Sequence, residues 1–254
     1  ALRTSVNLSP RMPEAHENLA FALGALGRYE DEGEALEHGL RLLPKSVELW
    51  LARARWFSRR ARHQEALEAC NQALRLVPNS AGAHRLAGDT LVELDRFKPA
   101  FEHLRTAAAL EPEEPEHWRR SGWCASALRD YEGAAKDYYN AWRCSGAPED
   151  LGRFAVQTAL AGDPMKGVAL ARQAVGEAGD AAAHSRLAQA LQAAGNTAEA
   201  AGEARRAVQL EPDSAQASAV LAEILGHVGE RDEATTLWRK VSVLDPTYVS
   251  RNRV

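Results

Sequence analysis

The chain has 254 residues, 45% of them apolar and 26% charged, and its formal net charge is -4. This composition is typical of a folded chain and excludes an intrinsically disordered one. The acidic balance is unlike the basic excess of nucleic-acid-binding proteins, and no stretch approaches the roughly 20 apolar residues of a membrane span. We therefore expect neither a nucleic-acid partner nor membrane insertion.

Prolines divide the chain into units of nearly constant length. They recur at intervals of 34 residues in two series, Pro10, Pro44, Pro78, Pro112, and then Pro212, Pro246. The 100 residues between the two series hold one unit of 34 residues and two of 33, and Gly146 stands where a fifth proline would fall. The sequence therefore predicts seven consecutive units, at 13–46, 47–80, 81–114, 115–147, 148–180, 181–214 and 215–248.

Each unit has the side-chain pattern of two packed helices. Counted from the start of a unit, positions 8, 20 and 27 are mostly Ala or Gly, which lets helix axes approach closely. Bulky residues fill the positions between them, and a glycine recurs at position 15, at Gly27, Gly162, Gly195 and Gly229. A turn in mid-unit and a proline at its end predict two helices of about 14 residues, and one pair needs its neighbours to bury its apolar face.

Residues outside the seven units are few. We expect residues 1–12 to be the end of a second helix from a partial preceding repeat and residues 249–254 to be a short tail. Because solenoids need polar caps, we expect a chain with these ends to be a fragment, or to have an end covered by a partner or a second copy.

Two units carry most of a known repeat signature, W-x2-L-G-x2-Y…A-x3-F…P with a period of 34 residues. The unit at 115–147 has Trp118, Gly122, Tyr131, Ala134, Tyr138 and Ala141 in phase, and the unit at 81–114 has Gly88, Phe97, Ala100, Leu104, Ala107 and Pro112. The chain therefore resembles the tetratricopeptide repeat (TPR) family. That resemblance implies an all-α fold, a right-handed α-solenoid (superhelix) of tandem helix-turn-helix repeats.

The resemblance also implies where a ligand binds, because the first helices of TPR units line a concave groove. The groove positions here are basic and partly aromatic, and one aspartate interrupts the basic row. They make up our candidate binding residues: Phe21, Arg55, Arg59, Arg85, Asp89, Arg119 and Trp123. Arg85 and Arg119 hold equivalent positions in successive units, which predicts a spacing on the order of 10 Å. Arginine pairs with carboxylates and tryptophan offers an apolar platform, so we expect a protein or peptide with acidic residues and an apolar anchor. The alternative is that these arginines form intramolecular ion pairs.

A second row of arginines recurs every 33 residues at position 6 of the unit, at Arg120, Arg153 and Arg186. For this row we favour a structural role, in which the guanidinium groups bridge neighbouring helices or loops.

Catalytic and cofactor motifs are absent from the sequence. No HExxH pair, GxSxG elbow or phosphate-binding glycine loop occurs, and the three widely spaced cysteines, Cys70, Cys124 and Cys144, form neither a CxxC pair nor a disulfide framework. We expect no cofactor, no metal and no enzymatic activity, and a cytoplasmic location, with the envelope or periplasm left open. The favoured function is a protein-binding adaptor or scaffold. Two alternatives stay open: a scaffold that self-associates through its solenoid ends, and the substrate-recruiting region of a larger enzyme.

Overall fold

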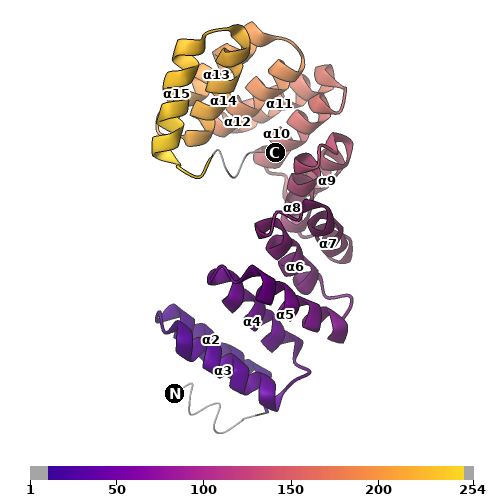
Figure 1. The fold of residues 1–254 in the computed structure, drawn as a ribbon. Helices are drawn as coiled ribbons and strands as arrows, with labels where there is room; N and C mark the ends of the chain where they lie inside the picture. The colour runs from indigo at the N-terminus through magenta and orange to yellow at the C-terminus, as the bar shows by residue number, and fades with distance from the viewer. Residues whose placement is uncertain (1–10, 249–254) are drawn as a thin grey trace. The chain divides into compact units, whose positions relative to one another are not determined.

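The protein is described by a computed structural model that covers residues 11–248, where all regular secondary structure is α-helical (Figure 1). Its helices are α2 (Pro13–Ala25), α3 (Tyr29–Leu42), α4 (Val47–Arg59), α5 (His63–Leu76), α6 (Ala81–Glu93), α7 (Phe97–Leu110), α8 (Pro115–Ala127), α9 (Tyr131–Ser145), α10 (Pro148–Leu160), α11 (Pro164–Ala178), α12 (Ala181–Ala193), α13 (Thr197–Leu210), α14 (Ala215–Val228) and α15 (Arg231–Leu244). The expected tail at 249–254 and most of the expected partial repeat at 1–12 lie outside the described residues.

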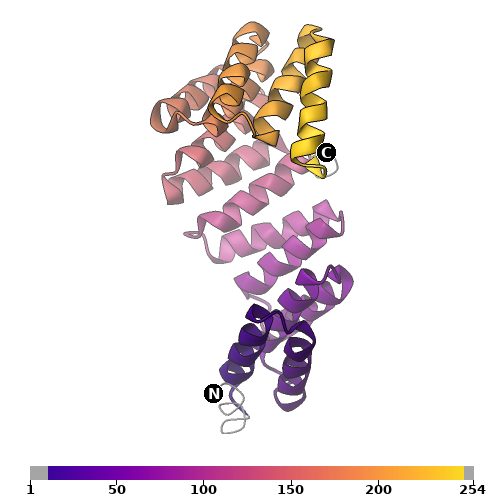
Figure 2. The ribbon, with the colours of Figure 1, turned by 90° about the vertical axis from the view of Figure 1, so that its left-hand side faces the viewer.

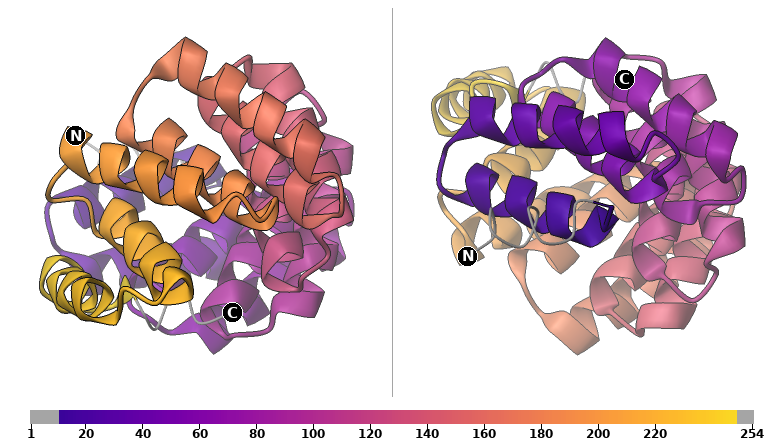
Figure 3. Two further views of the ribbon diagram at one scale, coloured as in Figure 1. Left: turned by 90° about the horizontal axis from the view of Figure 1, so that it is seen from above. Right: turned by 90° about the horizontal axis from the view of Figure 1, so that it is seen from below.

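The chain divides into two compact units that each hold several repeats. Residues 1–112 form the first unit and residues 113–254 form the second unit. In each unit, a helix packs against the next helix along the chain, and alternate helices also contact one another (Figures 1 and 2). These lateral contacts join α2, α4 and α6 in the first unit and α10, α12 and α14 in the second. The view from above shows α13, α14 and α15 of the second unit packed side by side (Figure 3). We call the surface formed by the even-numbered helices of each unit its first-helix surface.

Every helix pair turns through a left-handed residue at the same position. The four glycines predicted at this turn have φ values between 71° and 105°. In the remaining three pairs the same conformation is adopted by residues other than glycine, namely Ala61, Asp95 and Arg129, with φ of 55°, 56° and 60°. The left-handed turn therefore belongs to the helix pair itself, and the sequence shows it only where glycine relieves the strain.

Two glycines explain why two of the repeats, 115–147 and 148–180, are one residue shorter than the others. Helices α9 and α11 end at Gly146 and Gly179, which take φ values of 65° and 62°. A left-handed glycine ends a helix abruptly and satisfies its last carbonyl groups. The next helix begins after a loop of two residues, 146–147 or 179–180, instead of the four residues 111–114 between α7 and α8. Each of these helices is one residue longer than α7, so the net change is one residue.

The core is built from the small residues of the repeat. Ala66, Ala100 and Ala134 are fully buried where first and second helices cross. Gly167 takes the same position in α11, and a Cβ there would lie 2.7 Å from the backbone oxygen of Ala155 in α10. This contact is tighter than any methyl group tolerates, so α10 and α11 approach more closely than an alanine permits.

Tryptophan at a normally small position is accommodated by a glycine opposite. A Cβ on Gly33 of α3 would lie 2.5 Å from the ring of Trp56 in α4, so the missing side chain makes room for the indole. The indole Nε1 donates to the carbonyl oxygen of Tyr29 at 2.9 Å. The guanidinium of Arg60 lies over the same ring, 5.3 Å from its centroid. Trp56 therefore links α4 to α3 through specific contacts.

Candidate functional site

The candidate residues of the first unit pair mainly with residues of the same unit. Arg55 of α4 donates to Glu17 of α2 at 3.0 Å. Arg59 of α4 donates to the carboxylate of Glu32, which lies buried in α3. Each of these arginines therefore crosses from one helix to a neighbour.

Arg85 and Phe21 do not hold neighbouring helices together in the way that Arg55 and Arg59 do. Arg85 donates to Asp89 one turn later in α6, at 3.1 Å, and about a third of its side chain is exposed. An ion pair of this kind contributes only a few tenths of a kcal/mol. Phe21 of α2 is 76% exposed, which leaves most of its ring in water.

In the second unit, Arg119 is held by a buried carboxylate. Its Nε and Nη2 atoms donate to the two oxygens of Asp150, at 2.8 Å and 2.7 Å. Asp150 lies at the start of α10 with no exposed surface, and it also accepts from the Ser145 hydroxyl at 2.7 Å. Burial alone would raise the pKa of Asp150, but the hydrogen bonds from Arg119 and Ser145 outweigh burial and hold that pKa below its usual value.

Further ion pairs extend from Asp150 along α10 to α12. Arg153 of α10 lies 3.5 Å from Asp150 and donates to Glu149 at 2.7 Å. Arg186 of α12 donates to the same Glu149 oxygen at 3.2 Å. A continuous series of guanidinium and carboxylate groups thus connects α8, α10 and α12 across the first-helix surface of the second unit. Arg186 joins two neighbouring helices, as expected for its row, whereas Arg153 and Arg120 pair with acids on their own helices.

The four candidate arginines all form intramolecular ion pairs, which is the alternative that the sequence left open. Arg85 and Arg119 lie in different units, so their expected spacing stays a prediction, as does their contact with a ligand. Trp123 of α8 is 41% exposed. The candidate residues therefore offer two exposed rings and a set of guanidinium groups whose internal partners range from partly exposed to fully buried.

Sequence reasoning missed the acidic half of this surface. Asp150 and Glu149 were not among the candidate residues, although Asp150 stands at the third position of its repeat, where other repeats have Leu49, Ala83 or Ala217. These three residues are buried. A carboxylate in phase with buried apolar residues is the signal that could have identified an internal ion pair.

Metal-binding and membrane-spanning features are not found in the part of the chain that the structure describes. No group of three or more His, Cys, Asp or Glu side chains within residues 11–248 is arranged to hold a metal ion. No helix in that range is long and apolar enough to cross a bilayer.

Comparison with known proteins supports the prediction of tetratricopeptide repeats. A family model described as tetratricopeptide repeat matches residues 85–150 and 185–234. A TPR protein from Parabacteroides merdae superposes with a TM-score of 0.77 at 16% identity, covering 94% of this chain and 95% of that one. YrrB, a TPR protein with an unusual peptide-binding site, superposes with a TM-score of 0.61 at 17% identity, covering 76% of this chain and 97% of its own.

A curated relative is an enzyme of a larger size. Mouse (Mus musculus) protein O-mannosyl-transferase TMTC1 is 26% identical over 141 residues, which are 53% of this chain. The match spans only 14% of the length of that enzyme. The family model thus identifies tetratricopeptide repeats at residues 85–150 and 185–234, and the chain shares the all-α solenoid fold of TPR proteins.

Proposed function

We propose that this protein is an adaptor or scaffold that binds a segment of another protein along its first-helix surface. The observation that carries the proposal is that each unit has both an exposed aromatic ring and arginines on its first helices. The ring is Phe21 in the first unit and Trp123 in the second. Aromatic side chains supply apolar area with little loss of rotamer freedom, and arginines supply bidentate hydrogen bonds to carboxylates. YrrB, which shares the fold, is itself a TPR protein with a peptide-binding site.

The internal ion pairs determine how each arginine contributes. Arg55 and Arg85 have partly exposed partners, so a ligand carboxylate exchanges with Glu17 or Asp89 at little cost. Arg119 keeps its bond to the buried Asp150 and presents only its outer edge to a ligand. A few such contacts of roughly 0.5–2 kcal/mol each, with the apolar anchor of one unit, correspond to a micromolar dissociation constant.

A random peptide-display library tests this proposal. Peptides selected on the full chain should be enriched in Asp and Glu beside an aromatic or aliphatic residue. Arg85→Ala should weaken peptides that bind the first unit about tenfold, and Trp123→Ala should do the same for peptides that bind the second unit. Arg172→Ala is the matched control, because Arg172 lies on the second helix α11 in an exposed ion pair with Glu199. Failure to select any peptide, or equal losses in the control, contradicts the proposal.

The extent of the repeats follows the same reasoning. We assign repeats to 13–46, 47–80, 81–114, 115–147, 148–180, 181–214 and 215–248. We also propose a reducing, cytoplasmic setting, which the buried thiol of Cys70 supports. Burial raises the pKa of the Cys70 thiol to about 12, which keeps it protonated and unreactive.

A second candidate is supported by the relative that is an enzyme. The match to a small part of protein O-mannosyl-transferase TMTC1 favours a role as the substrate-recruiting region of a larger enzyme. The intact mass of the protein purified from its native source distinguishes the candidates, because only the second requires a far longer polypeptide. Sedimentation over a dilution series tests the remaining alternative, since self-association depends on concentration and adaptor binding requires a second species.

A further inference from the structure

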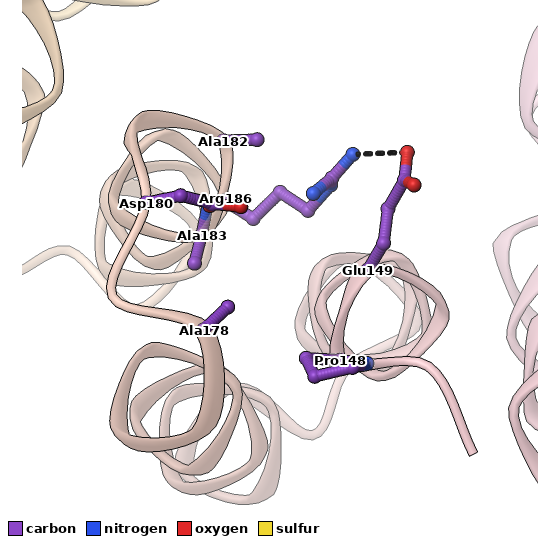
Figure 4. A pocket seen from close by; sticks show the side chains of 7 residues that line it. All are labelled: Pro148, Glu149, Ala178, Asp180, Ala182, Ala183 and Arg186. Carbon is purple, nitrogen blue, oxygen red and sulfur yellow. Dashed lines mark hydrogen bonds and ion pairs between the residues drawn. The ribbon is translucent and has the colours of Figure 1, made fainter. Parts of the chain in front are cut away.

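A small pocket opens between the N-terminal ends of α10 and α12 (Figure 4). Its volume is about 160 Å³, which is more than one water molecule needs. Its walls come from the start of α10, the end of α11, the residue before α12 and the first turns of α12: Pro148, Glu149, Ala178, Asp180, Ala182, Ala183 and Arg186. Apart from the three charged side chains, Glu149, Asp180 and Arg186, these walls are small and apolar.

The arginine in this pocket is buried along its whole length. Only 10% of the Arg186 side chain is exposed. Its aliphatic part crosses Gly152 of α10, where a Cβ would lie 2.8 Å from the Cδ atom of Arg186. Figure 4 shows the side chain extending from α12 toward α10, with its guanidinium directed at Glu149. Gly152 therefore allows a guanidinium group to sit at the pocket in a fixed position.

One exposed carboxylate serves two arginines at this point. Arg153 and Arg186 both donate to the same oxygen of Glu149, at 2.7 Å and 3.2 Å, and the Glu149 side chain is 57% exposed. Burial lowers the pKa of Arg186, and the nearby charge of Arg153 lowers it further. Asp180, the other acid at the pocket, accepts a hydrogen bond from the Ala183 amide at 2.7 Å and so caps α12.

We propose that this pocket binds the carboxylate of an Asp or Glu side chain from the bound protein segment, with Arg186 as its principal donor. Glu149 occupies the same donors in the free protein and leaves for solvent when the segment binds. The exchange replaces one carboxylate with another at these guanidinium groups, so their positive charge stays compensated. The ligand oxygens then receive bonds from a guanidinium that is already desolvated and fixed, and such charge-assisted bonds are stronger than those in water.

This inference rests on the proposed function, because it assumes that a protein segment meets the first-helix surface of the second unit. Its test must therefore work without a partner. The probe is N-acetylglutamate amide, titrated at millimolar concentration into the full ¹⁵N-labelled chain and followed by NMR. Saturable shifts should appear at the Ala182 and Ala183 amides and at the Arg186 Nε–H. N-acetylglutamine amide, which has the same shape without the charge, should give none.

Three variants separate a ligand site from a structural ion pair. Glu149→Gln removes the internal competitor and should tighten the probe about fivefold, because an exposed ion pair contributes up to about 1 kcal/mol. Arg186→Met keeps the aliphatic stem and should abolish the shifts, alone and combined with Glu149→Gln. The control Glu199→Gln makes the same change in net charge at the exposed pair with Arg172 and should leave the affinity unaltered.

Three results overturn the assignment: no saturation in the wild type, no gain in Glu149→Gln, or an equal gain in Glu199→Gln. Shifts with inorganic phosphate but not with the probe also reject a carboxylate ligand. The outcomes are separable from those of the peptide selection. Failure of the NMR titration removes this pocket and leaves the adaptor role standing. Failure of the selection with a positive titration removes the adaptor role and leaves a carboxylate-binding pocket whose ligand is not a protein segment.

Discussion

Loss of the Arg119 guanidinium should destabilise the second unit strongly, because it leaves the Asp150 carboxylate buried without its main partner. Asp150 has no exposed surface and accepts three of its hydrogen bonds from Arg119, at 2.7, 2.8 and 3.1 Å. Removing one partner of a buried pair costs 3–5 kcal/mol. Ser145 and Arg153 remain near the carboxylate, and the Arg119 side chain is itself 28% exposed. We therefore expect the low end of this range, about 3 kcal/mol, for Arg119→Ala.

Urea denaturation followed by circular dichroism measures this loss. The matched control is Arg85→Ala, whose partner Asp89 is one turn away and partly exposed, and it should cost no more than about 0.5 kcal/mol. The double replacement Arg119→Leu with Asp150→Leu removes both charges and should recover most of the loss, since apolar residues often substitute well for a buried pair. Equal stability of Arg119→Ala and Arg85→Ala would refute the reasoning.

The pH dependence provides an independent check on the same pair. The pKa of Asp150 in the folded protein lies below its usual value, so the pair stabilises the fold above the unfolded-state pKa of about 3.9 and loses this effect as the pH falls through the folded value. In Arg119→Ala, burial is no longer offset and the pKa of Asp150 rises. Protonation near pH 4 then relieves the buried charge, and the deficit relative to wild type should be smaller at pH 4 than at pH 7. An identical deficit at both pH values would contradict this account.

Three further predictions concern single positions. Arg129→Gly should raise the free energy of unfolding, measured by urea denaturation, by about 0.5 kcal/mol, because glycine adopts the φ of 60° without strain. Gly167→Ala should destabilise by about 1–3 kcal/mol, since its Cβ meets backbone atoms of α10, whereas Gly176→Ala in the same helix meets nothing and should not destabilise. The pKa of His103 is lowered first by burial and then by His84, so its neutral form stabilises the fold and this contribution is lost as the pH falls below about 6.5. The decrease in the urea concentration at the midpoint of unfolding between pH 7 and pH 5 should therefore be smaller in His103→Gln than in the wild type.

The helices could be predicted from the sequence because their signals are local and repeated. Small residues at fixed spacing, glycine at the mid-unit turn and proline at the boundary each restrict the backbone in the same way in every unit. Repetition then reinforces weak signals, as at Gly88, where glycine lies in phase with alanines of other units. The TPR fold follows from this pattern, and all regular secondary structure in the residues that the structure describes is helical.

The partners of the charged side chains could not be read in the same way. Arg119 and Arg85 occupy equivalent positions, yet one meets a buried aspartate 31 residues away and the other a partly exposed aspartate on its own helix. The difference depends on which helix packs beside each residue and on how much water that packing excludes. The left-handed turns at Ala61 and Arg129 were hidden for a related reason, since the neighbouring helices impose a conformation that neither residue favours.

The amino-acid sequence by itself thus determined the repeat, the helix pairs and the family, because these depend on the periodic placement of small and apolar side chains. Only the tertiary structure decided which arginines are committed to the fold and which carboxylate, Asp150 or Glu149, lies buried or exposed. The energy of a charge depends on its solvation and on its nearest opposite charge, and both are properties of the packed helices.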